Sequence, residues 1–139
     1  MPPIDTERIR AIGEMRRSAT ETLRLARLME KPALDDTALM QPVHERLRAH
    51  YAALDRRTAT RAEMLVLLWL FAPAMLEGGR RSGLMLEIAR TMGLTANNAY
   101  AYRGNLLISY ERYADFRKAV DDGIAVAMKA AEEKTETLH

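Results

Sequence analysis

Residues 84–104 read LMLEIARTMGLTANNAYAYRG, and the spacing of small, apolar and turn residues predicts two short helices joined by a tight turn. Ala89 is the small residue that lets two helices cross, and Gly93, four positions later, tolerates the positive φ that such a turn needs. Leu94 is expected to fill the gap between the helices, and Thr95 to cap the second one. The other inward positions are expected to be Ile88, Met92, Ala99 and Tyr102.

The rest of the chain also has a helical composition. Ala, Leu, Met, Arg and Glu dominate, and no alternating run of β-branched residues indicates a strand. With 139 residues, of which 48% are hydrophobic, the chain is long enough for one compact domain. We therefore predict an all-α fold, a bundle of five or six helices with an embedded helix-turn-helix.

The chain is expected to consist of two parts joined by a linker. Residues 1–31 are predicted to form an N-terminal helical arm, whose helix reaches about Glu30 and has one apolar stripe. Lys31–Asp36, with a proline and two aspartates, is the clearest linker. Residues 37–139 then form the helical core, with the helix-turn-helix at about 84–104.

Two further helices are expected before the helix-turn-helix. One should run from Pro42 to about Arg57, since proline suits a first helical turn. Thr60 and Glu63 have the spacing of a capping box and predict the start of the next helix. Leu65–Ala72 is apolar on every side, which is typical of a core helix or an oligomer interface.

Proline and glycine set the remaining boundaries. Pro73 should kink or end the preceding helix, and Glu77–Gly83 should form a loop. A long amphipathic helix is expected after Gly104, with frayed ends beyond Lys129.

Several kinds of chemistry have no residue pattern to support them. Cysteine is absent, and His44 and His50 fall on different faces of one helix, so no metal site is expected. No serine lies in a recognisable nucleophile motif, so we expect no enzyme and no cofactor. Charges near the N-terminus replace the apolar run of a signal peptide, and Met64–Leu76 is too short to cross a bilayer, which predicts a cytoplasmic protein.

The stretch IARTMGLTANNAYAYR (88–103) resembles the helix-turn-helix family of DNA-binding proteins. The resemblance implies that Ala96–Asn105 is a recognition helix lying in the major groove of double-stranded DNA. Asparagine pairs with adenine and arginine with guanine, so the candidates for base edges are Asn97, Asn98, Tyr100 and Arg103. Thr95 at the helix start could meet a phosphate, and the candidates for other backbone contacts are Arg80, Arg81 and Arg90.

A longer run, from LLWLFAPAMLEGG (67–79) to NLLISYERYADFRKAV (105–120), is similar to short prophage-encoded proteins that have no assigned activity. The predicted function is a phage- or bacterial-type transcriptional regulator that binds DNA as a homodimer, through the N-terminal helix or the Leu65–Phe71 helix. Two alternatives stay open. The hairpin could serve packing alone, or the chain could be a protein-binding, phage-assembly or small-terminase-like DNA-packaging component.

Overall fold

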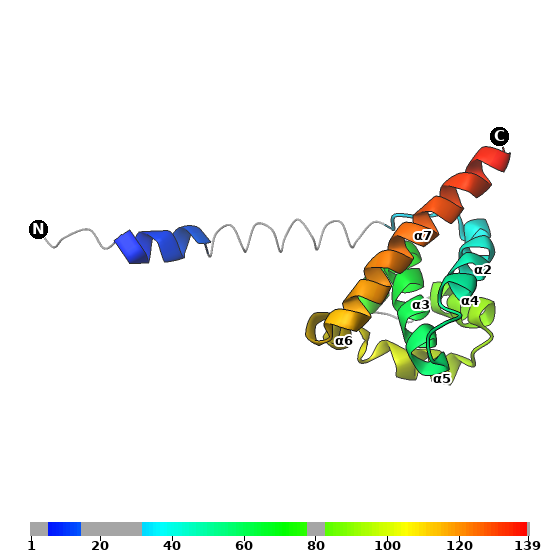
Figure 1. The fold of residues 1–139 in the computed structure, drawn as a ribbon, viewed down its shortest axis with the longest axis horizontal. Coiled ribbons are helices and arrows are strands. Elements are labelled where there is room, and N and C mark those ends of the chain that lie inside the picture. Colours follow the sequence, from blue (N-terminus) through cyan, green and yellow to red (C-terminus); the bar gives the residue numbers. More distant parts are fainter. Residues whose placement is uncertain (1–5, 15–31, 78–82, 139) are drawn as a thin grey trace, which may run out of the picture. The chain divides into compact units, whose positions relative to one another are not determined.

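The computed structural model describes residues 6–14, 32–77 and 83–138, and the chain divides into two compact units, Met1–Lys31 and Pro32–His139 (Figure 1). In the first unit, residues 6–14 form a helix on which Ile9 and Ile12 are 59% and 46% exposed. The rest of the predicted N-terminal helix, up to Glu30, lies outside the described residues.

The second unit is built from helices, and none of its described residues lies in a strand. Its elements in chain order are η1 (Thr37–Leu39), α2 (Met40–His50), α3 (Arg56–Phe71), η2 (Pro73–Glu77), α4 (Gly83–Met92), α5 (Ala96–Arg103), α6 (Leu106–Arg112) and α7 (Ala114–Leu138). The predicted all-α bundle is confirmed.

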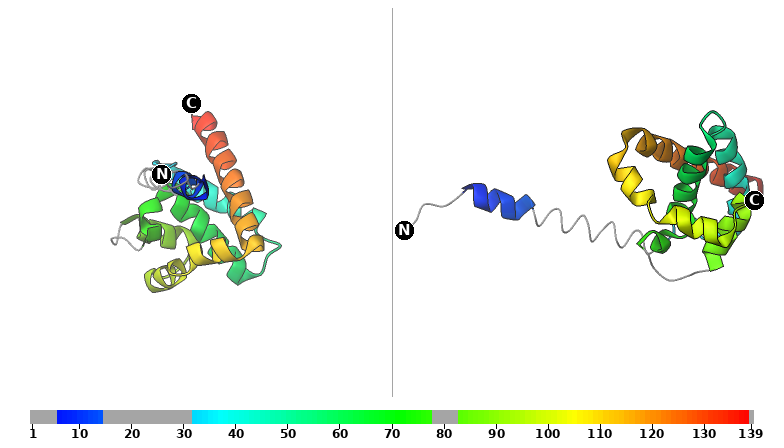
Figure 2. Two further views of the ribbon diagram at one scale, coloured as in Figure 1. Left: turned by 90° about the vertical axis from the view of Figure 1, so that its left-hand side faces the viewer. Right: turned by 90° about the horizontal axis from the view of Figure 1, so that it is seen from below.

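Helix α3 is the centre of the core. It lies between α7 on one side and the α4–α5 hairpin on the other, and it also contacts α2 and α6 (Figure 2). Every residue from Ala62 to Leu68 is buried, as are Leu70 and Phe71. Of the two possibilities for the apolar run, the core is the one observed, because the chain's own helices already cover the Leu65–Phe71 surface that was proposed for a dimer.

The helix predicted from Pro42 is confirmed as α2, but its predicted end at about Arg57 is wrong, because α2 ends at His50 and the chain turns before α3. The carboxylate of Asp55 accepts a hydrogen bond from the Thr58 N–H at 3.0 Å and caps α3. Tyr51 is buried at the end of α2, and its hydroxyl donates to the Ala119 carbonyl of α7 at 2.6 Å. The Tyr51 side chain thereby holds the C-terminal end of α2 against α7.

The predicted capping box at Thr60 and Glu63 is also wrong. Thr60 lies inside α3, and its hydroxyl donates to the Arg56 carbonyl one turn earlier, at 2.7 Å. Glu63 is buried and pairs with His44 of α2. Helix α3 therefore starts one turn before the predicted box.

The boundaries near the C-terminus differ from prediction as well. The helix expected after Gly104 is divided at Tyr113 into α6 and α7, and α7 continues to Leu138 rather than fraying after Lys129. The break predicted at Pro73 is confirmed, since α3 ends at Phe71 and η2 follows. Among the helices described, none has the length and apolar character needed to cross a membrane.

Candidate nucleic-acid interface

The turn between α4 and α5 has the predicted geometry. Gly93 adopts a φ of 73°, in the left-handed region that favours glycine. The Leu94 N–H donates to the Ala89 carbonyl at 2.8 Å, and the Gly93 N–H to the Arg90 carbonyl at 3.1 Å. These two bonds form a Schellman motif, which ends α4 and redirects the chain within three residues.

Helix α5 starts at once after this turn. The Thr95 hydroxyl accepts a hydrogen bond from the Asn98 N–H at 3.2 Å, so the predicted cap is confirmed. Ile88, Ala89 and Ala99 are buried as expected, while Met92, Leu94 and Tyr102 are half-buried. Because α3 contacts both α4 and α5, the three helices form one packed unit that holds α5 in place.

The exposed face of α5 carries the amide side chains. Asn97 and Asn98 are both exposed, as is Ala101 one turn later. The helix ends at Arg103, two residues before the predicted Asn105. The amides are therefore available to a partner, but the helix is only eight residues long.

The other residues predicted to contact DNA differ in their exposure and in the partners that they already have. Tyr100 is half-buried, and Thr95 already uses its hydroxyl for the cap. Arg90 is exposed on α4 and lies 3.4 Å from the Glu87 carboxylate. Arg80 and Arg81 lie outside the described residues, and so does the side chain of Arg103.

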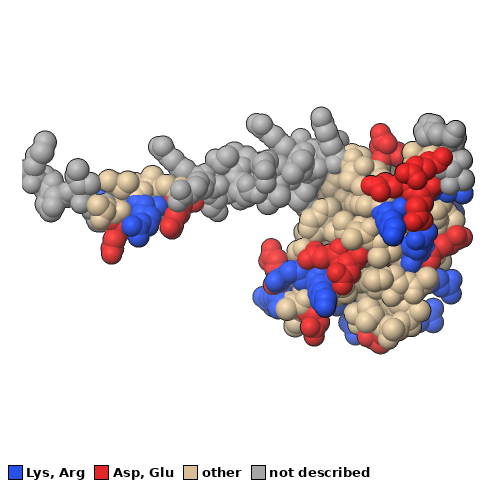
Figure 3. Space-filling model, turned by 45° about the horizontal axis from the view of Figure 1, so that its top comes forward, with Lys and Arg blue, Asp and Glu red and all other residues tan. Residues whose placement is uncertain are grey.

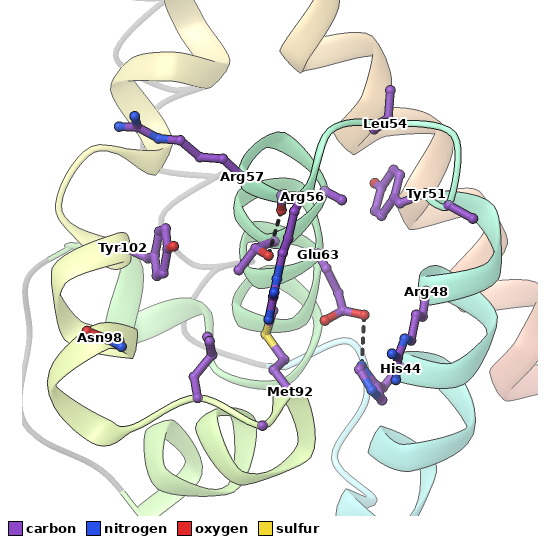
Figure 4. Close-up of a pocket in the computed structure, with 15 residues that line it drawn as sticks. His44, Arg48, Tyr51, Leu54, Arg56, Arg57, Glu63, Met92, Asn98 and Tyr102 are labelled. Atoms are coloured by element: carbon purple, nitrogen blue, oxygen red, sulfur yellow. Dashed lines mark hydrogen bonds and ion pairs between the residues drawn. The ribbon is translucent and has the colours of Figure 1, made fainter.

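Two hollows lie beside α5, and they meet at three shared lining residues, Arg57, Asn98 and Tyr102. The α2–α5 hollow, of about 920 Å³, lies between α2, the start of α3 and the α4–α5 turn (Figure 4). The α5–α6 hollow, of about 550 Å³, lies between α5, α6 and the outer side of α3. We refer to the two hollows together as the depression beside α5.

Most of the charged residues that line this depression are arginines. The α2–α5 hollow contains Arg48, Arg56 and Arg57, and the α5–α6 hollow adds Arg61 and Arg112. The carboxylate among the lining residues is that of Glu63, which is 6% exposed. The depression therefore has a marked excess of positive charge.

Glu63 lies at the floor of the α2–α5 hollow and is held by a histidine. Nδ1 of His44 lies 2.8 Å from its Oε1. Burial raises the pKa of Glu63, while His44 and Arg48 offset part of that rise. His44 is the group in direct contact with the Glu63 carboxylate, and the charge of Arg48 acts on it from farther away.

Arg61 is positioned by its neighbours. Its guanidinium donates to the Ser109 hydroxyl at 2.5 Å and lies 5.2 Å from the centre of the Phe116 ring. This side chain links α3 to α6 and α7 and brings its charge to the wall of the α5–α6 hollow. The arginines on α3 thus line both hollows from a rigid core helix.

On the face shown in Figure 3, basic and acidic side chains are interspersed. Arg46 of α2 pairs with Glu133 of α7 at 2.5 Å, and Glu132 and Glu136 are also exposed near the end of α7.

Sequence reasoning missed His44, Arg48, Arg56, Arg57 and Arg61. Two features of the sequence could have indicated these residues. One is the pair of arginines directly after Asp55, and the other is the single acidic residue, Glu63, within an apolar run. Reading Glu63 as part of a capping box hid its role, because its partner lies 19 residues away in sequence.

Among the residues that the structure describes, no group of three or more histidines, aspartates and glutamates is placed to hold a metal ion. Comparison of the chain with models of protein families, with curated proteins and with solved structures finds no match, so the interpretation of this site rests on its own geometry.

Proposed function

We propose that the chain binds double-stranded DNA, with the exposed face of α5 toward the base edges and the neighbouring arginines against the phosphates. The observation that carries the proposal is the position of Asn97 and Asn98, exposed on a helix that a fixed turn and α3 hold in place. Arg57 and Arg112 line the depression beside that helix. Amides that read bases and guanidiniums that position the backbone are the two parts of a DNA interface.

The short α5 limits what one copy can read. Ala96 and Ala101 have little reach, so a single helix contacts few bases. We propose that two copies bind paired half-sites, as a transcriptional regulator would, and that the N-terminal unit joins them. The exposed Ile9 and Ile12 are apolar surface that a second copy would cover.

The proposal is tested by fluorescence anisotropy with mixed duplex DNA at about 50 and about 200 mM salt. We expect binding that weakens steeply with salt, since each phosphate neutralised contributes a slope of about −0.9 in log affinity against log salt concentration. Arg57→Gln and Arg112→Gln should each weaken binding and reduce that slope by about 1.

Arg46→Gln is the matched control, because it removes the same charge from an exposed arginine that pairs with Glu133 between α2 and α7. It should bind DNA like the wild type. After selection of a preferred sequence, Asn97→Ala and Arg103→Ala should each cost about 1–3 kcal/mol at one base position. A folded protein that does not bind at low salt would contradict the proposal and favour a protein-binding role for this surface.

Oligomer size separates the regulator from the packaging alternative. A dimer by light scattering is expected, whereas a ring of many subunits would favour a small-terminase-like component.

A further inference from the structure

We propose that the α2–α5 hollow binds a small phosphate monoester with a flat organic body. The site lies beside the DNA-binding surface proposed above and does not depend on it. Its volume of about 920 Å³ is that of a small-molecule site, for which about 300–1,000 Å³ is usual. Of the two arginines proposed to contact DNA, Arg112 lines the other hollow and Arg57 lines both.

Three arginines give the hollow its charge. Arg48 comes from α2, and Arg56 and Arg57 come from the first turn of α3. Among the described residues none of the three lies within salt-bridge distance of a carboxylate, although Arg48 is near enough to Glu63, and Arg57 to Asp55, for its charge to favour the ionised form of that carboxylate. Figure 4 shows Arg56 extending through the hollow toward Met92, and Arg48 beside His44.

The charge fits a dianion. Against the three guanidiniums stands the carboxylate of Glu63, so the lining residues carry a formal surplus of two positive charges when His44 is neutral. Arginine is the residue that pairs with phosphate through two parallel hydrogen bonds. A phosphate monoester supplies about two negative charges on oxygens that such donors recognise.

Other parts of the lining are apolar or aromatic. Leu54 borders the hollow from the α2–α3 turn, beside the arginines, and Met92 and Leu94 border it from the α4–α5 turn on the other side. The ring of Tyr102 from α5 completes this side (Figure 4). A flat ring can lie against these side chains while its phosphate reaches the arginines. Inorganic phosphate alone would contact the arginines and leave the apolar side chains without a partner.

The hollow also connects two parts of the fold. Its basic side belongs to α2 and α3, and its apolar side belongs to the turn and helix that present Asn97 and Asn98. Arg57 lines this hollow and is also proposed to contact DNA, so a bound ligand should compete with DNA for that guanidinium and weaken DNA binding.

The test uses the full chain and isothermal titration calorimetry with AMP and with phenyl phosphate. We expect saturable binding of one molecule per chain for both. Adenosine, which lacks the phosphate, and inorganic phosphate, which lacks the ring, should each bind at least tenfold more weakly. The double variant Arg48→Gln/Arg56→Gln should lose at least tenfold in AMP affinity, whereas Arg46→Gln, which removes an arginine of α2 outside this hollow, should bind AMP like the wild type.

Circular dichroism establishes that each variant is folded. Absence of binding by both monoesters to the folded wild type, or equal AMP affinity of wild type and double variant, would overturn the proposal. If neither monoester binds and Arg48→Gln/Arg56→Gln weakens DNA binding instead, the hollow receives a DNA phosphate and the proposal is also overturned. None of the calorimetric outcomes involves DNA, so failure of the DNA-binding proposal remains distinguishable.

Discussion

Nδ1 of His44 and Oε1 of Glu63 lie 2.8 Å apart at the floor of the α2–α5 hollow, with 11% and 7% of the two side chains exposed. The contact joins α2 to the central helix α3 where both border the arginine-lined depression. A buried carboxylate without a partner is costly, and the imidazole is the group that compensates it here.

The first prediction concerns the pH dependence of stability. Burial raises the pKa of Glu63 above its ordinary value of 4.5, and His44 and Arg48 offset part of that rise. A group whose pKa is raised by folding stabilises the folded state while it is protonated, and this contribution is lost as pH rises through the raised pKa. As pH rises from the ordinary pKa of 4.5 through the raised pKa, the wild type should therefore lose stability relative to Glu63→Gln.

Urea unfolding at steps of pH measures this difference in the free energy of unfolding. Glu45→Gln is the control, since Glu45 is exposed on α2, and its difference from the wild type should stay nearly constant with pH. A wild type that gains stability relative to Glu63→Gln as pH rises would show that the attraction of His44 outweighs the effect of burial.

Local residue chemistry was enough to predict the α4–α5 hairpin. Gly93 and Thr95 act within a few residues of their own positions, one through its φ and the other through the Asn98 N–H. The apolar run after Ala62 likewise predicted a buried helix, because no exposed face was available to it.

The breaks at 51–55 and at Tyr113 could not be predicted in this way. Ala52 and Ala53 are good helix formers, and no proline or glycine lies beside Tyr113. Helix α2 ends where Tyr51 bonds to Ala119, 68 residues away, and α6 ends where its last carbonyls bond to Arg117 of the next helix. Tertiary contacts there override local propensity.

The same distinction between local and tertiary contacts explains which residues of the candidate site could be predicted. Asn97 and Asn98 followed from the hairpin pattern. The arginines of α2 and α3 lie far from α5 in sequence, and only the packing of α3 against α5 brings them to the same depression.

The second prediction tests the turn before α5. Gly93→Ala should destabilise the protein by about 1–2 kcal/mol, because an L-residue is strained at a φ of 73°. Gly104→Ala is the control: Gly104 has a φ of −59°, and the nearest atom to an added Cβ is the Ala101 carbonyl oxygen at 3.9 Å. Urea unfolding measures both variants, and equal stabilities would contradict the left-handed conformation.

The third prediction concerns the contact between α2 and α7. A Cβ added at Gly123 would meet the Tyr51 hydroxyl and would also lie 3.1 Å from Val66 Cγ2. Gly123→Ala should therefore destabilise the protein by about 1–3 kcal/mol through overpacking. Tyr51→Phe, which removes the hydroxyl, should reduce the cost of Gly123→Ala in a double-mutant cycle. Additive effects would show that the two residues do not meet.

The last prediction concerns the corner between α6 and α7. Arg117 donates from Nε to the Tyr110 carbonyl at 3.0 Å and from Nη2 to the Glu111 carbonyl at 2.5 Å, so it satisfies acceptors at the end of α6. Arg117→Ala should lower the free energy of unfolding by about 1 kcal/mol, because both hydrogen bonds are lost. The loss stays small because the site is exposed and water can take the place of the guanidinium as donor.

Trp69 reports on this corner, since it is the chain's one tryptophan and its ring centre lies 5.4 Å from that of Tyr110. Its emission should shift in Arg117→Ala under native conditions and should not shift in Lys118→Ala, which removes an exposed cation from the next position. If both variants leave the emission and the free energy of unfolding unchanged, Arg117 does not hold α6 against α7, and the break at Tyr113 has another cause.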